Sequence, residues 1–131
     1  MFRPAYNFHG GGEPVQKGPY TVATGITVTQ GMGCMLSSGE VTTSTTSSSH
    51  AGFAVADAAA GAEVYLYDVS TVMAIVDANA RIDGASLDFA TGAQAVTSKT
   101  NDDVVVVRTS ASSEDTLIMI HPIKTIYYTS S

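Results

Sequence analysis

The sequence predicts an all-β protein, a small β-barrel or sandwich with an extended N-terminal arm. Three observations support this: apolar runs are short and separated by turn residues, an internal repeat covers most of the chain, and the first twenty residues differ in composition from the rest. A length of 131 residues suits one domain. We therefore expect an arm over residues 1–20 and a single β-barrel domain over residues 21–131.

The arm is predicted from residues 1–20, "MFRPAYNFHGGGEPVQKGPY", which hold three of the four prolines and four of the ten aromatic residues. Proline and glycine at this density disfavour a helix or a central strand. Phe2, Arg3, Tyr6 and Phe8 supply aromatic and charged groups that anchor contacts with a neighbouring molecule. We expect the arm to reach a neighbour, and its deletion to leave a folded domain; the alternative is that it folds back on its own domain.

The strands are predicted from runs rich in Val, Ile, Tyr and Phe that are bounded by Gly, Asp, Asn and Ser. In order these runs are "ITVT", "GFAVA", "EVYLYDV", "VMAIV", "SLDF", "DVVVVRT" and "TLIMIHPI". The hydroxyl-rich tract "TTSTTSSS" at residues 42–49 is predicted to be a strand that runs into an exposed loop.

An internal repeat appears when the sequence is shifted by 53 residues, so that the segment starting at Gly31 aligns without a gap on the segment starting at Gly84. Gly39 then falls on Gly92, and Phe53 falls on Val106. Further along, Leu66 falls on Met119. The repeat predicts two similar strand-turn-strand units, residues 31–69 and 84–122, related by a pseudo-twofold axis.

Some predicted strands are apolar without alternation, such as "VVVV" and "LIMI". Strands of this kind are covered on both faces. In so small a domain the second cover is either the protein's own core or another subunit, and the sequence leaves both open.

Residues that could support chemistry are sparse. His9, His50 and His121 are far apart in the sequence, and the acidic pairs at 102–103 and 114–115 lie in predicted turns. Cys34 occupies an apolar strand position and is expected to be a small buried hydrophobe. A G-x-S-x-G elbow and a phosphate-binding glycine loop are both missing. We expect no enzyme, no metal and no cofactor.

Charge and apolar runs limit the partners. The net charge is −6, which makes nucleic acid a poor partner. The apolar runs are far below the roughly 20 residues of a membrane-spanning helix, and a secretory leader is not evident. We expect a soluble protein that is made in a cytoplasm and does not bind membranes.

The order of these features resembles the capsid decoration, or cement, proteins of tailed viruses. The resemblance rests on the arm followed by "TVATGITVTQGMGCMLSSGEV", "GFAVADAAAGAEVYLYDV", "ARIDGASLDFATGAQAV" and "DDVVVVRTSASSEDTLIMIHPI". It covers residues 20–122 and includes an I-x-x-G-x-x-L-x-x-x-T-G-like segment from Ile82 to Gly92. The hydroxyl-rich tract has no counterpart in the family pattern.

The resemblance implies a small barrel of the β-tulip kind that binds the outer surface of an assembled capsid and stabilises it without chemistry. The implied partners are the major capsid protein and further copies of the chain, as a homotrimer on capsid symmetry axes, in a virion assembled in a host cytoplasm. The alternative is a carbohydrate-binding or adhesive β-module of a virion fibre or cell surface, with Tyr65/Tyr67 and Tyr127/Tyr128 as aromatic platforms. A role at the head-to-tail junction is also compatible with the sequence.

Overall fold

The computed structural model describes residues 2–45, 49–90, 92–97 and 101–127 of the chain. Within these residues the chain forms eleven strands and one short 3-10 helix. They are β1 (Arg3–Asn7), β2 (Gln16–Thr21), β3 (Gly33–Ser37), β4 (Glu40–Thr43), β5 (Gly52–Ala54), β6 (Glu63–Asp68), β7 (Thr71–Asp77), β8 (Ser86–Ala90), β9 (Ala95–Thr97), β10 (Val104–Arg108), β11 (Glu114–Ile120) and η1 (Pro122–Lys124).

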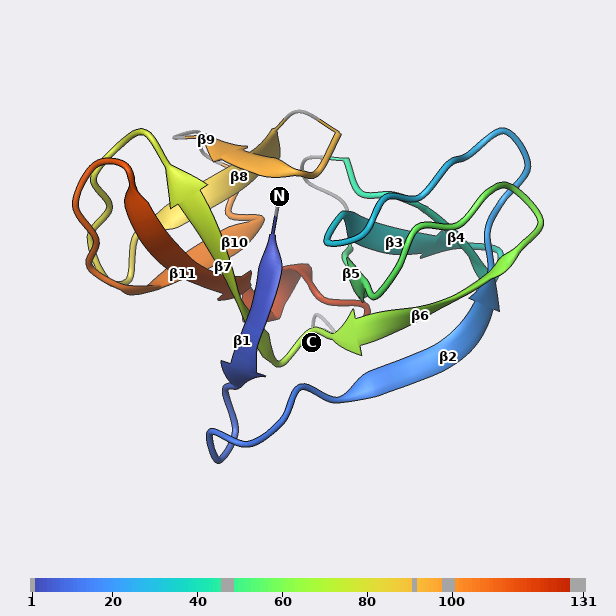
Figure 1. Cartoon of the computed structure of the whole chain (residues 1–131), viewed down its shortest axis with the longest axis horizontal. Helices are drawn as coiled ribbons and strands as arrows, with labels where there is room; N and C mark the ends of the chain where they lie inside the picture. Colours follow the sequence, from blue (N-terminus) through green and yellow to red (C-terminus); the bar gives the residue numbers. More distant parts are fainter. Residues whose placement is uncertain (1, 46–48, 91, 98–100, 128–131) are drawn as a thin grey trace.

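The strands form two antiparallel sheets, which lie at the left and right of Figure 1. The six-stranded sheet has the order β1-β7-β11-β10-β8-β9, and the five-stranded sheet has the order β2-β6-β5-β3-β4. In the described part of the chain neither sheet closes into a barrel, although a single bridge between Val22 and Val41 brings β4 back towards the end of β2. The all-β prediction is confirmed, and a sandwich describes the fold better than a barrel does.

The internal repeat is present in the structure. β3 and β8 begin 53 residues apart, at Gly33 and Ser86. The order β2-β6-β5-β3-β4 recurs as β7-β11-β10-β8-β9, and β1 is added outside β7. The aligned turn glycines Gly31 and Gly84 both have positive φ, at 80° and 85°. The duplication therefore relates two whole sheets.

The first hairpin is two residues longer in the second repeat, where Ala90 pairs with Ala95, than in the first, where Ser37 pairs with Glu40. The segment from this hairpin to the next strand is three residues shorter, so the ungapped alignment is off by one residue from there on. The backbone N–H of Gly31 donates to the carbonyl oxygen of Ala54, and that of Gly84 donates to Val106. Val106 therefore corresponds to Ala54. The ungapped alignment had predicted Phe53 as its counterpart, and this was wrong by one residue.

The same one-residue offset continues into the last strand of each repeat. Leu66 pairs with Ala54, and Ile118 pairs with Val106. The structural counterpart of Leu66 is therefore Ile118, one position before the Met119 that the alignment had chosen.

The core lies between the two sheets and is centred on three phenylalanines. Phe2 is 1% exposed, and its ring centroid lies 5.3 Å from that of Phe53 and 5.9 Å from that of Phe89. Phe53 and Phe89 are 6.0 Å apart. Because Phe53 belongs to β5 and Phe89 to β8, the N-terminal residue Phe2 seals the contact between the sheets.

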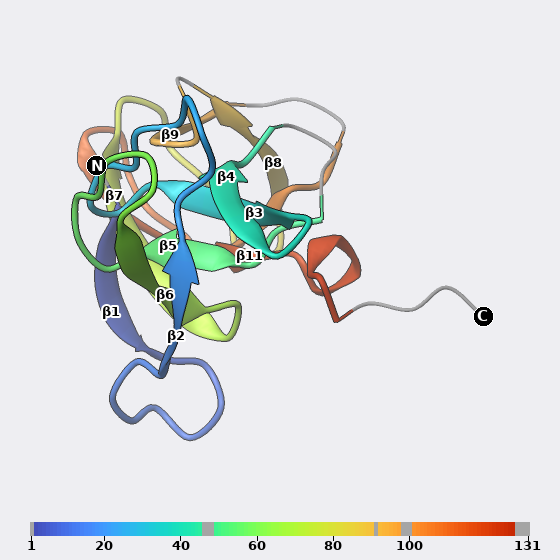
Figure 2. The same cartoon turned by 90° about the vertical axis from the view of Figure 1, so that its right-hand side faces the viewer.

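The expectation of a separate arm over residues 1–20 is wrong for the single chain, since this segment supplies the first strand of each sheet. β1 pairs with β7, and β2 pairs with β6. Both are edge strands, where proline is tolerated because one side of the strand needs no hydrogen bond. Within this segment, the loop between β1 and β2 is the part that projects from the body in Figures 1 and 2.

The C-terminal segment packs against the first repeat. The backbone N–H of His50 donates to Lys124 O at 2.6 Å, and Ile126 N–H donates to His50 O at 3.0 Å. Lys17 Nζ lies 2.9 Å from the hydroxyl of Tyr127 and 3.1 Å from a carboxylate oxygen of Asp68. The segment after β11 thus closes the seam between the sheets next to His50.

Candidate functional site

The four predicted contact residues, Phe2, Arg3, Tyr6 and Phe8, are placed in different environments. Phe2 is in the core and is not available to a neighbour. Arg3 forms an ion pair with Asp115, and Tyr6 is half-buried opposite Val72. Phe8 is 49% exposed in the loop between β1 and β2. The structure therefore leaves Phe8 as the freely exposed aromatic side chain of this set.

The six-stranded sheet has an apolar outer face, opposite the core. Cross-strand pairs that point away from the core are Tyr6 with Val72, Ala74 with Leu117, and Val105 with Met119. None of these residues belongs to the central core cluster, although Val72, Ala74 and Met119 are themselves buried, at 0%, 7% and 9% exposure. The same face also carries an ion pair between Arg3 and Asp115, which lie opposite Ala74 and Val76. Val76, the next outward residue of β7, is 62% exposed. We use "outer face" for these seven residues.

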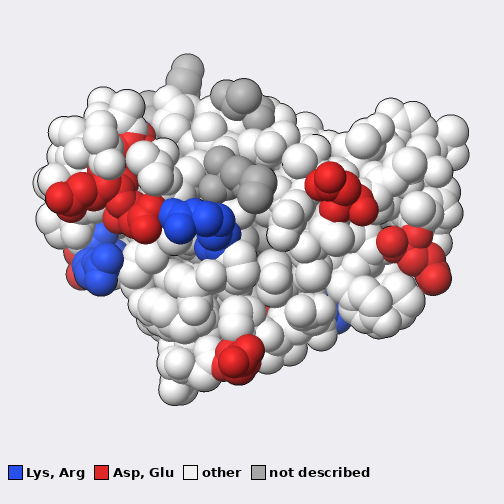
Figure 3. Space-filling model, in the orientation of Figure 1, with Lys and Arg blue, Asp and Glu red and all other residues white. Residues whose placement is uncertain are grey.

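The outer face explains part of the non-alternating apolar pattern. Val104 and Val106 point into the core, whereas Val105 points to the outer face, and the same holds for Ile118 and Met119 in β11. On the side of the molecule seen in Figure 3, acidic and basic side chains lie next to one another at the left, over the six-stranded sheet, and wide uncharged areas separate the remaining acidic groups. An apolar sheet face of this kind is suited to contact with another protein surface.

A shallow apolar hollow adjoins the outer face at Met119. Its volume is about 200 Å³, and Val69, Pro122 and Tyr127 are among the residues that line it. Continuity through Met119 extends the outer face towards the loop between β1 and β2, which contributes His9 to the hollow. The apolar surface is therefore larger than the sheet face alone.

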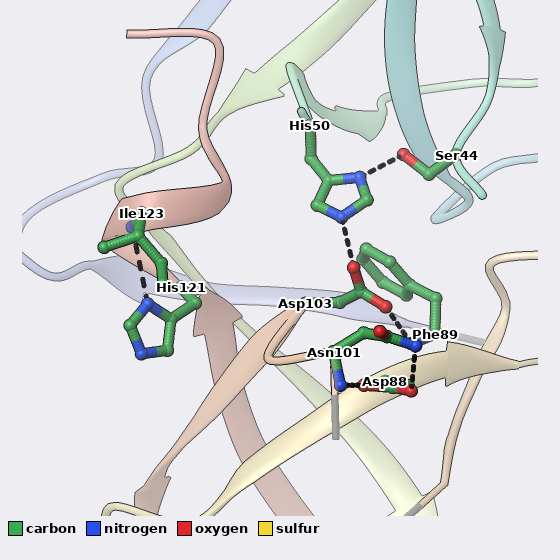
Figure 4. Close-up of polar contacts among 8 residues, drawn as sticks. All are labelled: Ser44, His50, Asp88, Phe89, Asn101, Asp103, His121 and Ile123. Atoms are coloured by element: carbon green, nitrogen blue, oxygen red, sulfur yellow. Dashed lines mark hydrogen bonds and ion pairs between the residues drawn. The ribbon is translucent and has the colours of Figure 1, made fainter. Parts of the chain in front are cut away.

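A buried polar cluster lies between the sheets, and it is the group of residues that sequence reasoning missed. Figure 4 shows the imidazole of His50 between the hydroxyl of Ser44 and the carboxylate of Asp103. His50 Nδ1 lies 2.8 Å from Ser44 Oγ, and Nε2 lies 2.9 Å from Asp103 Oδ1. His50 and Asp103 are fully buried, and Ser44 is 4% exposed. The rings of Phe89 and His50 are arranged edge to face, with their centroids 4.9 Å apart.

The hydrogen-bond partners determine where the protons lie. Asp103 also accepts a hydrogen bond from the backbone N–H of Phe89, as expected of an ionised carboxylate, which only accepts. With Asp103 ionised, the neutral imidazole of His50 carries its hydrogen on Nε2, and Nδ1 accepts the hydroxyl hydrogen of Ser44. Burial lowers the pKa of His50 below its usual value of 6.5, and the hydrogen bond that His50 donates to Asp103 offsets this only in part.

A sequence signal for this cluster did exist in the repeat. The 53-residue shift aligns His50 with Asp103, and the structure places them just before the matching strands β5 and β10. The one-residue offset makes Ala51 the structural counterpart of Asp103, so His50 and Asp103 lie at neighbouring positions of the two repeats and not at equivalent ones. The ungapped alignment of a histidine with a carboxylate was therefore only an approximate clue.

The cysteine, the tyrosine pairs and the hydroxyl-rich tract lie in different environments. Cys34 is buried as predicted, and burial raises the pKa of its thiol to about 12. Tyr65 is 47% exposed and lies on the same face of β6 as the half-buried Tyr67, while Tyr128 lies outside the described residues. Part of the tract at 42–49 belongs to β4, and residues 46–48 lie outside the described part.

Comparisons with known proteins add no identification. No protein-family model matches the chain, and a search of curated proteins finds no match. Among the described residues, no helix is long and apolar enough to cross a membrane, and no group of three or more His, Cys, Asp or Glu side chains is arranged to hold a metal ion.

Proposed function

We propose that this protein is a structural component of a virion, a decoration or cement protein that binds the outer surface of an assembled capsid. The single observation that carries the proposal is the outer face of the six-stranded sheet. It offers Val105, Leu117 and the exposed Val76 to a partner, next to the apolar hollow at Met119. The resemblance of the sequence to decoration proteins suggests which partner this is.

The proposed partners are the major capsid protein and further copies of the chain, arranged as a homotrimer. Identical subunits around a symmetry axis repeat one modest contact, and several simultaneous contacts raise the apparent affinity without any new chemistry. Capsid stabilisation needs no catalytic group, so a β-sandwich with an apolar face is sufficient for this function.

A pair of matched variants tests the proposal. Val76→Lys places a charge on the outer face, beside its cross-strand neighbour Asp115, a carboxylate that also pairs with Arg3. Tyr65→Lys makes a comparable change on the five-stranded sheet. Co-sedimentation with capsids that lack the protein should show about tenfold weaker binding for Val76→Lys and native binding for Tyr65→Lys. Equal binding of both variants would remove the outer face from the proposal.

The alternative of a carbohydrate-binding module is supported by one observation, the shared face of Tyr65 and Tyr67 on β6. Aromatic side chains on one face of a strand can stack on a sugar ring. Binding of the isolated protein to a glycan array, lost in Tyr65→Lys and kept in Val76→Lys, would favour this alternative. Binding to the assembled capsid lattice alone would favour decoration.

A further inference from the structure

Ser44, His50 and Asp103 form a hydrogen-bond chain with one direction. Asp103 accepts from Nε2–H of His50, and Nδ1 of His50 accepts from the hydroxyl of Ser44. A carboxylate that orients an imidazole, which in turn accepts a serine proton, is the arrangement by which serine nucleophiles are activated. Here the imidazole faces the serine with Nδ1 and the carboxylate with Nε2, and the roles of the three groups are the same.

The Ser44 end of this hydrogen-bond chain lies at a surface hollow. An open cavity of about 320 Å³ is lined by Ser44, by its neighbours Thr43 and Thr45, and by Phe89, Ala90 and Ala93 of the β8–β9 hairpin. Ser44, at 4% exposure, is thus the member of the cluster that lines the cavity, while His50 and Asp103 lie behind it at 0% exposure. Such a cavity has room for a small ester and a mainly apolar lining to hold its acyl part.

We propose that Ser44 is an activated nucleophile that takes an acyl group from a small carboxylic ester entering this cavity. Ser44 Oγ bonds to the carbonyl carbon, and the bond between that carbon and the ester oxygen breaks. The Oγ proton passes to Nδ1 of His50 and from there to the departing alcohol or phenol. The product is an ester of Ser44, and water is needed only for its later release.

The backbone N–H groups near Ser44 limit the rate of acyl transfer. Ser44 N–H donates to Gly33 O at 3.0 Å, and Gly33 N–H donates to Ala93 O at 2.9 Å. These two donors are occupied and do not stabilise an oxyanion, a contribution worth about 100-fold or more in rate. The site therefore reacts stoichiometrically with activated esters and phosphonates, with slow turnover.

The first experiment uses the native purified chain, without capsids, so that its outcome is independent of the proposed decoration role. The chain is incubated with a fluorophosphonate probe, which reports activated serines, and the modified residue is mapped by peptide mass spectrometry. The expected result is one adduct per chain, on Ser44. An unmodified Ser44 in folded protein after prolonged incubation overturns the proposal.

The second experiment separates activation from simple exposure. Ser44→Ala should abolish both the adduct and acetylation by p-nitrophenyl acetate at this position, whereas Thr43→Ala, which alters a hydroxyl lining the same cavity, should leave Ser44 reactive. His50→Gln should slow the labelling by about 100-fold or more, because glutamine cannot take the proton. The native labelling rate should be constant above pH 7 and fall at lower pH as His50 becomes protonated. A rate that stays constant from pH 8 down to the lowest pH at which the chain remains folded contradicts activation by His50, whether or not the His50→Gln variant folds.

Discussion

His50 and Asp103 join the two sheets through a hydrogen bond of 2.9 Å between Nε2 and Oδ1, in a position with no access to solvent. Asp103→Asn replaces one of the two accepting oxygens with an amide donor, so either Nε2–H of His50 or the N–H of Phe89 loses its acceptor. We expect the free energy of unfolding to fall by about 2–3 kcal/mol, measured by urea denaturation. The control is Asp102→Asn at the adjacent position, which should change it by less than about 0.5 kcal/mol.

The stability of the fold should decrease on mild acidification because of His50. Its pKa in the folded chain lies below the usual 6.5, so the unfolded chain binds more protons between these two values. The free energy of unfolding is therefore greatest above pH 6.5 and falls as the pH decreases through 6.5 towards the folded pKa. Urea denaturation of the native chain and His50→Gln at pH 7.5 and 5.5 tests this. The decrease should be smaller in His50→Gln, and identical decreases would contradict it.

The N-terminus should contribute to stability. Phe2→Ala removes a ring that contacts both Phe53 and Phe89, and the cavity should cost about 3–5 kcal/mol. Phe8→Ala, on an exposed ring, should cost less than about 1 kcal/mol. Thermal unfolding of the two variants compares them directly. Removal of residues 2–18 should for the same reason destabilise the domain, which reverses the expectation drawn from the sequence.

A close backbone approach at Gly52 gives a further prediction. A Cβ atom at this residue would lie 2.0 Å from the carbonyl oxygen of Tyr67, and its φ of 154° is one that other residues rarely adopt. Gly52→Ala should therefore destabilise the chain by about 3 kcal/mol. Gly12→Ala, in open space at an ordinary φ, should have almost no effect. Comparable melting temperatures for the two variants would show that β5 can move away from β6 at little cost.

The fold could be predicted from the sequence as far as local patterns determine it. Short β-branched runs and the turn glycines Gly31 and Gly84 were sufficient for the strand class and the duplication, because both depend on spacing. The offset at Val106 was not predictable, since changes in loop length leave the hydrophobic pattern almost unchanged. The role of the N-terminal segment was misjudged because prolines that exclude a central strand are compatible with an edge strand.

The candidate sites depended on tertiary structure and were harder to predict. Ser44 and His50 are separated by six residues, whereas His50 and Asp103 are separated by 53 and meet only when the two sheets face each other. The outer face was indicated by non-alternating strands, but the sequence could not distinguish Val104, which points to the core, from Val105, which points away from it.

The position of β1 has a consequence for the order in which the nascent chain can fold. The five-stranded sheet takes all its strands from residues 16–68, so its partners are complete before β7 has been synthesised. β1 comes first in the chain, yet its partner spans Thr71–Asp77, and Phe2 must also await Phe89. Such distant pairings carry a large loop-closure cost and form late. The residues of β1 therefore leave the ribosome before those of β7 and yet are among the last to reach their native place, and until then the β7 edge stays open to pairing with another nascent copy.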